Sequence, residues 1–330
     1  MMRRMIGLIA VAVLLAVAPA RAEDITGGKY DVSVARDLVY GRGLVDVSRD
    51  GGRMRDLHMD VYRPVEAGKP LMDRPAIVMI FGGAFLRGSK GFQHFEEDGA
   101  SDSSMADYCS LFARAGYVCA AIEYRLAPED PGVREPDSAR MLPQGLLTGP
   151  AATARMEVVR QRMGLPPLDD AGRAQLWRAY LAASEDLAAA VFHVRDHAAD
   201  FGAASDRIAI GGFSAGAITV VNGAYGMGLP VKAAVVLSGG MGAYDIRQSA
   251  RRDMPPALFF LAQNDLPGVQ IGTRAALAAL DTAGVTAERA WVPGFGHFYP
   301  MGAVSLGSDM SRQPVERRIL DFLGRTIGGE

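Results

Sequence analysis

The chain has 330 residues, of which 49% are hydrophobic and 22% are charged, so it can bury the large core of a globular α/β domain. Its formal net charge of −2 excludes the strongly basic surface that nucleic-acid binding requires. We therefore expect a small-molecule partner and no nucleic acid.

The first 22 residues have the pattern of a secretory signal peptide. A basic segment, MMRRM, precedes the apolar run IGLIAVAVLLAVA, and Ala20-Arg21-Ala22 forms an A-x-A cleavage site. The run is short for a membrane span, although an uncleaved anchor helix is the alternative. We expect cleavage after Ala22 and export to the periplasm or the medium. The mature domain, residues 23–330, should then have no stable membrane span, and the pattern leaves the export route open.

From about residue 37 the sequence alternates short apolar runs with helical patterns. The predicted strands are 37–40, 59–62, 76–81, 118–124, 207–212, 233–238, 257–262 and 289–292. The predicted helices are 103–116, 185–201 and 315–327. Nearly unbroken apolar strands are typical of strands covered by helices on both faces. The alternation predicts an α/β fold with a mostly parallel, doubly wound sheet in a single domain.

About sixty residues separate the strand that ends at Tyr124 from the helix around Asp186, far more than α/β connections usually need. Two helical patterns, 152–164 and 171–183, lie within this insertion and are separated by LPPLDD. Lids and substrate caps are inserted at the carboxyl edge of such sheets. We expect residues of about 127–184 to form a helical cap, the alternative being a helical excursion that takes no part in binding.

Only two cysteines are present, Cys109 and Cys119, and they do not form a C-x-x-C motif. Cys109 lies in a predicted helix and Cys119 near the start of the next strand. A tight turn at Ala115-Gly116 could bring the two thiols within disulfide distance. The sequence leaves two states open: a disulfide, which an oxidising compartment would favour, and two buried free thiols.

The segment RIAIGGFSAGA (207–217) contains a G-x-S-x-G motif centred on Ser214. A nucleophile on a strand–turn–helix elbow needs small flanking residues, here Gly212 and Gly216. The following helix would direct the positive end of its dipole at a developing oxyanion. Because a motif this short also occurs by chance, the role of Ser214 depends on finding its partners.

A serine nucleophile needs a base and a group that orients the base. His297 lies in the glycine-rich loop PGFGHFYP after the last apolar strand, and Asp265 follows the strand PALFFLA. Asp253 and Asp281 do not end an apolar strand. Ser214, Asp265 and His297 therefore form the predicted catalytic set. The remaining histidines lie before an early strand, in a polar loop or in a helix: His58, His94, His193 and His197.

The segment IFGGAFLRGS (80–89) follows another predicted strand and has the glycines of a loop that approaches a substrate closely. Backbone N–H groups in such a loop stabilise the oxyanion of a tetrahedral intermediate. We predict that Gly83, Ala84 and Ala215 form the oxyanion hole.

The segments YRLAPE (124–129) and RIAIGGFSAG (207–216) resemble the hormone-sensitive-lipase-like branch of α/β-hydrolase esterases. DVYRP (60–64) is also similar to the feruloyl/acetyl-esterase-like relatives. The resemblance runs from about residue 58 to the C-terminus, apart from the insertion. It implies the α/β-hydrolase fold, ester hydrolysis, and Ser214, Asp265 and His297 as the triad. Phe81-Gly82-Gly83-Ala84 stands where the family usually has H-G-G-G, so the histidine that helps to hold this loop is missing.

Other chemistries find less support in the sequence. The segment HVRDH (193–197) lacks the glutamate of H-E-x-x-H, no phosphate-binding P-loop occurs, and Gly41-Arg42-Gly43 lacks a third glycine. We expect no metal and no cofactor. Two alternatives to a serine esterase are a peptidase of the prolyl-oligopeptidase type, for whose propeller domain the chain has no room, and a non-catalytic binding protein. The sequence determines neither the natural ester nor the oligomeric state.

Overall fold

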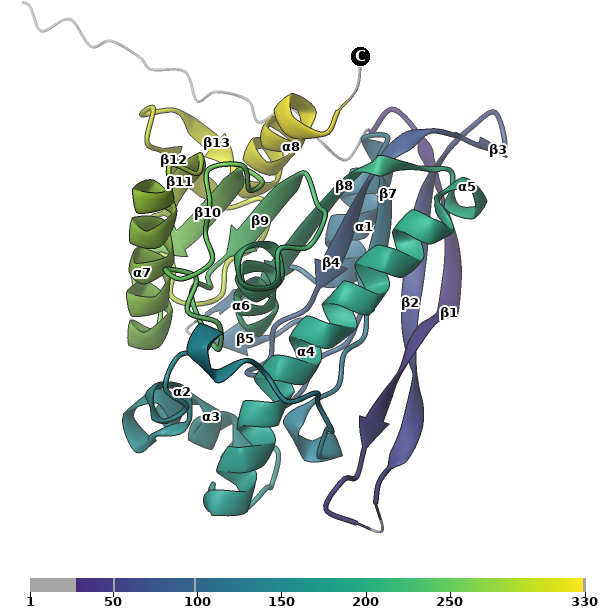
Figure 1. Ribbon diagram of the computed structural model, residues 1–330. Coiled ribbons are helices and arrows are strands. Elements are labelled where there is room, and N and C mark those ends of the chain that lie inside the picture. The colour runs from purple at the N-terminus through teal and green to yellow at the C-terminus, as the bar shows by residue number, and fades with distance from the viewer. Residues whose placement is uncertain (1–27, 50, 98, 329–330) are drawn as a thin grey trace, which may run out of the picture.

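The computed structural model describes residues 28–49, 51–97 and 99–328 and centres on one large twisted sheet (Figure 1). The expected signal peptide, residues 1–22, lies outside the described residues. The order of strands along the sheet is β1-β2-β7-β4-β8-β9-β10-β11-β12-β13, with β3 paired to β2. Their bounds are β1 Asp31–Val45, β2 Arg53–Glu66, β3 Lys69–Pro70, β4 Arg74–Ile80, β7 Val118–Ile122, β8 Ala203–Phe213, β9 Ala233–Leu237, β10 Ala257–Ala262, β11 Ala287–Val292, β12 Val304–Gly307 and β13 Arg312–Pro314.

The middle of the sheet is parallel and its margins are antiparallel. Strands β7, β4, β8, β9, β10 and β11 pair in parallel, whereas β1, β2, β12 and β13 join by antiparallel ladders. β7, β9 and β10 are buried at every position, as the unbroken apolar runs predict. The predicted doubly wound sheet is therefore confirmed.

The two opening strands are much longer than the sequence analysis predicts. β1 and β2 form a ribbon of 15 and 14 residues, where the apolar runs marked only 37–40 and 59–62. Most of β1 is exposed or half-buried, because it is an edge strand that pairs on one side only. Polar residues on its solvent side interrupt the apolar run without interrupting the ladder.

Helices cover both faces of the sheet. The long helix α4 (Asp170–Asp196) passes in front of the strands and α1 (Met105–Arg114) lies behind them (Figure 1). The other helices along the sheet are α5 (Ala198–Phe201), α6 (Ala215–Val221), α7 (Pro267–Ala283) and α8 (Val315–Thr326), with a π-helical turn at Asn222–Met227. None of the helices in the described ranges combines the length and the apolar character needed to cross a membrane.

The prediction of separate helices at 171–183 and 185–201 is wrong, because α4 runs without a break through residues 170–196. Gly172 near its start is the only glycine in it, and proline is absent, so nothing in the sequence stops the helix near Ser184. The insertion also holds the 3₁₀ turns Ala127–Glu129 and Ser138–Arg140, helix α2 (Gly145–Thr148) and helix α3 (Pro150–Arg162). Residues 170–184, which we expected in the cap, thus form the first half of a helix that packs on the sheet.

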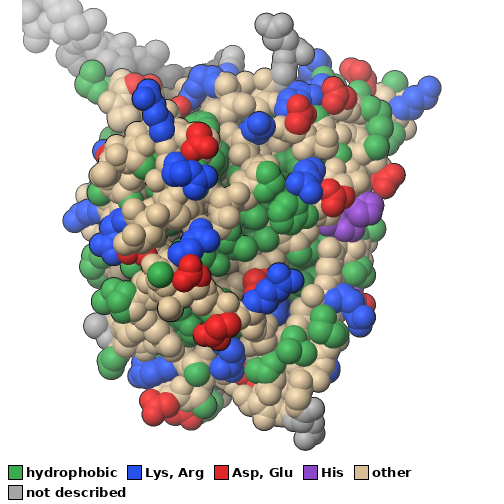
Figure 2. All heavy atoms as spheres, in the orientation of Figure 1, with side chains coloured by type: hydrophobic (Ala, Val, Ile, Leu, Met, Phe, Trp, Pro, Cys, Tyr) green, Lys and Arg blue, Asp and Glu red, His purple; other side chains and the backbone are tan. Residues whose placement is uncertain are grey.

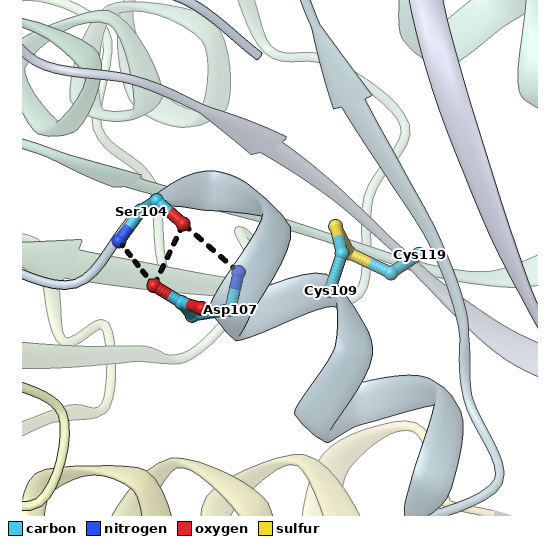
Figure 3. The surroundings of a disulfide bond; sticks show 4 residues. All are labelled: Ser104, Asp107, Cys109 and Cys119. Atoms are coloured by element: carbon cyan, nitrogen blue, oxygen red, sulfur yellow. Dashed lines mark hydrogen bonds between the residues drawn. A yellow bond between two sulfur atoms is a disulfide. The ribbon is translucent and has the colours of Figure 1, made fainter. Parts of the chain in front are cut away.

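A disulfide links Cys109 of α1 to Cys119 of β7, with a Cα–Cα distance of 5.1 Å (Figure 3). Both cysteines are fully buried. Ser104 begins α1 with a capping box: its hydroxyl accepts a hydrogen bond from the Asp107 N–H, and its own N–H donates to the Asp107 carboxylate. The capping box closes the first turn of α1, and the disulfide ties the helix to the sheet.

β4 lies between β7 and β8 in the sheet. The next parallel strand after β4 along the chain, β7, lies on one side of it, and the strand after that, β8, lies on the other side, so the order of the strands reverses at β4. Ligands bind in such sheets outside the carboxyl ends of the strands at this switch point. The segments after β4, β8, β9, β10 and β11 all begin at this edge. A small two-stranded sheet, β5 (Glu96–Glu97) with β6 (Ala100–Ser101), lies in the connection between β4 and α1.

Candidate active site

Ser214 occupies the sharp turn between β8 and α6. Its backbone has φ 55° and ψ −116°, a conformation that residues other than glycine rarely adopt. Such a conformation costs of order 1–3 kcal/mol and is held only where the surrounding structure enforces it. The Ser214 N–H donates to the Leu237 carbonyl at 2.8 Å, which ties the turn to the end of β9. The strained turn between a strand and a helix has the local geometry that the G-x-S-x-G motif predicts.

The two glycines of the motif are required by close backbone approaches. A Cβ atom on Gly212 would lie 2.6 Å from the carbonyl carbon of Gly216. A Cβ atom on Gly216 would lie 2.1 Å from the carbonyl oxygen of Ile80, at the end of β4. Any side chain at either position would therefore push the elbow away from the neighbouring strand.

The structure brings the three predicted catalytic residues into one hydrogen-bonded chain. Nε2 of His297 lies 2.8 Å from the Ser214 hydroxyl, and Nδ1 of His297 lies 2.6 Å from a carboxylate oxygen of Asp265. His297 comes from the loop between β11 and β12, and Asp265 follows β10. His297 and Asp265 are 6% and 3% exposed, so water does not compete for their contact. This is the geometry of a nucleophile, a base and a group that orients the base.

Ser238 contacts the carboxylate oxygen of Asp265 that does not contact His297, and Tyr299 contacts Ser238. The sequence analysis predicted a role for neither Ser238 nor Tyr299. The Ser238 hydroxyl lies 2.5 Å from the second carboxylate oxygen of Asp265 and 3.1 Å from the Tyr299 hydroxyl. The Leu266 N–H donates to the first oxygen at 2.8 Å. Ser238 directly follows β9 at the edge that holds the triad, and that position is the signal that could have identified it.

The competing residues lie elsewhere. Asp281 pairs with Arg289, and Asp253 lies 3.4 Å from Arg251, in both cases with exposed side chains. His58 lies 3.5 Å from Glu123. The rings of His193 and His197 stack on each other at 4.2 Å on α4, and burial lowers the pKa of His193. In the described ranges no group of three or more His, Cys, Asp or Glu side chains is arranged to hold a metal ion.

The predicted oxyanion loop lies beside Ser214. Gly83 and Ala84 line the same pocket as Ser214, and Ala215 is the first residue of α6. Ala84 has φ 59° and Gly83 has φ 123°, so the chain turns tightly here. The Leu86 and Arg87 N–H groups both donate to the Gly83 carbonyl, which closes the turn. A first-turn N–H such as that of Ala215 has no partner within its own helix, so it can donate to a substrate oxygen.

The YRLAPE segment (124–129) contacts the predicted oxyanion loop through two hydrogen bonds and a ring contact. The Tyr124 hydroxyl donates to the Phe81 carbonyl at 3.2 Å, and the two rings lie 4.4 Å apart. The Ala127 N–H donates to the Phe85 carbonyl at 2.8 Å. Arg125 in turn binds the Asp186 carboxylate on α4 at 2.7 Å. The motif is therefore a brace between the oxyanion loop and the helix that covers the sheet.

The triad opens into a narrow pocket of about 30 Å³. Its lining residues are Gly83, Ala84, Arg87, Phe95, Arg155, Val159, Ser214, Leu266, His297 and Phe298. Arg155 and Val159 belong to α3, so part of the insertion faces the nucleophile. The sequence analysis named none of the non-triad walls except the oxyanion loop.

A larger hollow of about 580 Å³ lies between β1, α4 and the loop around Val133. Among the described residues that line it there is no serine, cysteine or histidine, whereas Ser214 and His297 line the smaller pocket. The face on which α4 lies carries interspersed positive and negative side chains rather than a field of one sign (Figure 2).

Comparison with solved structures identifies the fold. Esterase 2 of Thermogutta terrifontis, in a form phosphorylated by paraoxon, matches with a TM-score of 0.52 at 18% identity, covering 90% of this chain and 92% of that chain. A truncated carbohydrate esterase from gut microbiota matches with a TM-score of 0.55 at 14% identity, covering 90% and 97%. No protein-family model and no curated protein sequence matches the chain. The predicted α/β-hydrolase fold is thereby confirmed, and the branch within it stays a prediction.

Proposed function

We propose that the protein is a serine hydrolase that cleaves carboxylic esters. The observation that carries the proposal is the chain of hydrogen bonds from Ser214 through His297 to Asp265, set beside the Gly83, Ala84 and Ala215 N–H groups. A serine hydroxyl needs such a base to act as a nucleophile, and the esterase neighbours give the same expectation for this fold.

The geometry supports a two-step reaction. With its proton on Nδ1, His297 donates to Asp265 and accepts the Ser214 proton at Nε2 while the serine oxygen bonds to the ester carbonyl carbon. The carbonyl oxygen becomes an oxyanion that the loop N–H groups stabilise. His297 then returns the proton to the leaving alcohol as the C–O bond breaks. Water, deprotonated by His297, then attacks the acyl carbon. The bond from this carbon to the Ser214 oxygen breaks, His297 returns the proton to the serine oxygen, and the carboxylic acid is released.

Ser214→Ala is the direct test. We expect hydrolysis of p-nitrophenyl acetate to fall by at least about 10³-fold, because the covalent route is lost. Paraoxon should place one diethylphosphoryl group on each wild-type chain, located at Ser214 by peptide mass spectrometry. An adduct on another residue, or full activity in Ser214→Ala, would show the proposal to be wrong.

Asp265→Asn tests the orienting role with a matched control. The amide favours the wrong tautomer of His297, so kcat should fall by orders of magnitude. Asp281→Asn removes the same charge from an exposed position on α7 and should leave kcat near the wild-type value. Equal effects of the two substitutions would refute the assignment.

We further propose that residues of about 127–169 act as the cap, because α3 lines the pocket, and that the protein is exported after cleavage behind Ala22. The disulfide between Cys109 and Cys119 supports export, since such bonds persist in oxidising compartments. N-terminal sequencing of the secreted or periplasmic protein should begin at Glu23. An intact Met1 on the exported protein would contradict the cleavage.

A further inference from the structure

Two arginines form part of the wall of the Ser214 pocket. Arg87 belongs to the segment 80–89 after β4 and Arg155 belongs to α3, so two segments far apart in the sequence each contribute a cation to one small pocket. The proposed ester chemistry needs neither charge, because the N–H groups of the loop stabilise the oxyanion. The two guanidiniums therefore call for a separate explanation.

Arg155 is held in position by an acidic partner. Its guanidinium bonds to both carboxylate oxygens of Glu97, at 2.7 and 2.5 Å, and lies 5.9 Å from the centre of the Phe298 ring. Arg162, the last residue of α3 and about two helical turns after Arg155, binds the same carboxylate at 3.2 Å. The Glu97 carboxylate thus pairs with two guanidiniums, and its side chain is only 20% exposed.

Within residues 28–49, 51–97 and 99–328, no carboxylate pairs with Arg87. Its guanidinium lies 4.4 Å from the centre of the Phe95 ring, and its Nε atom is buried without a hydrogen-bond partner among the residues described. Burial lowers the pKa of Arg87, and the nearby Arg155 and Arg162 guanidiniums lower it further. Arg87 is half-buried, and a guanidinium that is repelled by neighbouring guanidiniums leaves strong hydrogen-bond donors for an anion.

Acidic groups also lie near these arginines. Among the described residues, the carboxylates of Glu97 and Asp102 act on Arg87. Burial raises the pKa of Asp102 to about 6, so this group loses part of its charge in weakly acidic solution. Among the described residues that line the pocket beside Ser214, Arg87 and Arg155 carry a charge of one sign and no carboxylate is present.

We propose that the ester substrate carries a carboxylate, which Arg87 and Arg155 bind while Ser214 attacks the ester carbonyl. This inference rests on the proposed function. A planar carboxylate matches the donor fork of a guanidinium, and the narrow pocket places the anion close to the scissile bond. The substrate class is a monoester of a short dicarboxylic acid or an ester whose alcohol bears a carboxylate.

The test compares charged and neutral esters of equal size. For the acyl side the pair is mono-p-nitrophenyl glutarate and p-nitrophenyl valerate; for the alcohol side it is 4-acetoxybenzoate and 4-acetoxybenzamide. We expect the charged member of one pair to have a kcat/KM at least about tenfold higher than its neutral partner, because a hydrogen bond to a charged group contributes that much. The pair that shows the preference identifies the side on which the carboxylate lies.

Arg87→Gln and Arg155→Gln should each reduce this ratio several-fold, and Arg87→Lys should retain part of it. Arg325→Gln is the matched control, since Arg325 pairs with Glu288 at the exposed surface of α8 and should leave the ratio unchanged. If a pocket variant fails to fold, the wild-type ratio measured at low and high salt gives the same information, because screening weakens a partly exposed ionic contact.

The outcomes separate the two proposals. Equal rates for both members of both pairs, or a ratio that neither Arg87→Gln nor Arg155→Gln changes, would overturn the carboxylate inference while leaving ester hydrolysis intact. Hydrolysis of none of the four esters would overturn the proposed function and this inference with it.

Discussion

At the scale of single residues, the site is a set of buried polar groups that orient one another. Asp265 accepts hydrogen bonds from His297, from the Ser238 hydroxyl and from a backbone N–H, so each carboxylate oxygen has a donor. Tyr299 continues the chain behind Ser238. Because these groups are buried, an unmade hydrogen bond costs more here than at the surface. We therefore propose that Ser238 positions Asp265 against His297.

Ser238→Ala should lower kcat by roughly tenfold, because Asp265 loses one of the donors that hold it against His297. The freed carboxylate should also be a stronger acceptor, which moves the acidic limb of the kcat/KM profile to higher pH. A pH series with p-nitrophenyl acetate measures both effects.

Ser184→Ala is the control for this substitution. Ser184 is also fully buried and hydrogen-bonded, to the Tyr180 carbonyl and Asn222, but it does not contact the triad. It should reduce stability and leave the pH profile in place. An unchanged pH profile of kcat/KM in Ser238→Ala would show that Ser238 contributes to packing and does not position Asp265.

At the scale of elements, the oxyanion loop depends on the segment after β7. The loop departs from the H-G-G-G pattern, and Tyr124 and Ala127 supply hydrogen bonds that hold its carbonyl groups. Arg125 and Asp186 attach the same segment to α4. The insertion thus begins from a point that is already rigid, which places α3 over the pocket.

Tyr124→Phe should lower kcat several-fold with little change in KM, because the loop donors act mainly on the transition state. It should also lower the free energy of unfolding by about 1 kcal/mol, as expected for one hydrogen bond. Steady-state kinetics and urea unfolding measure the two quantities.

Tyr225→Phe provides the comparison for the loop. Tyr225 is equally buried and donates its hydroxyl proton to the Pro255 carbonyl at 3.0 Å, away from the pocket. Loss of this hydrogen bond should lower the free energy of unfolding and leave kcat unchanged. A kcat loss of the same size in both variants would argue against a specific role of Tyr124.

At the scale of the whole molecule, the sheet brings five strand ends to one edge and a disulfide secures one covering helix. The triad members come from the ends of β8, β10 and β11, with Ser238 after β9 and the oxyanion loop after β4. α1 covers the other face and is linked to β7 through Cys109 and Cys119. A substitution that weakens the packing of a covering helix on the sheet should therefore lower the free energy of unfolding more than it lowers kcat.

Loss of the disulfide should lower the free energy of unfolding by at most about 3 kcal/mol, because the closed loop is short. For a domain of this size we expect the melting temperature to fall by roughly 5 °C. Calorimetry of the wild type, with and without full reduction, measures the shift. The Cys109→Ala/Cys119→Ala double variant should melt at the same temperature with and without reductant. A wild type whose melting temperature does not respond to complete reduction would contradict the prediction.

The sequence by itself determined the parts of this protein that depend on local pattern. Apolar runs identified the central strands, and a glycine-flanked serine identified the elbow. The order of Ser214, Asp265 and His297 along the chain identified three residues that the structure brings together. These features can be recognised in the sequence because strand burial, tight turns and the residue types of a triad each constrain neighbouring positions.

Only the tertiary structure decided the features that depend on distant residues meeting. It extended β1 and β2 through their mutual ladder, joined two predicted helices into α4, and placed α3 over the nucleophile. It also brought Ser238 to Asp265 and the arginines of two segments into one pocket. Such contacts arise from packing and charge between residues separated by tens of positions, which leave no periodic trace in the sequence.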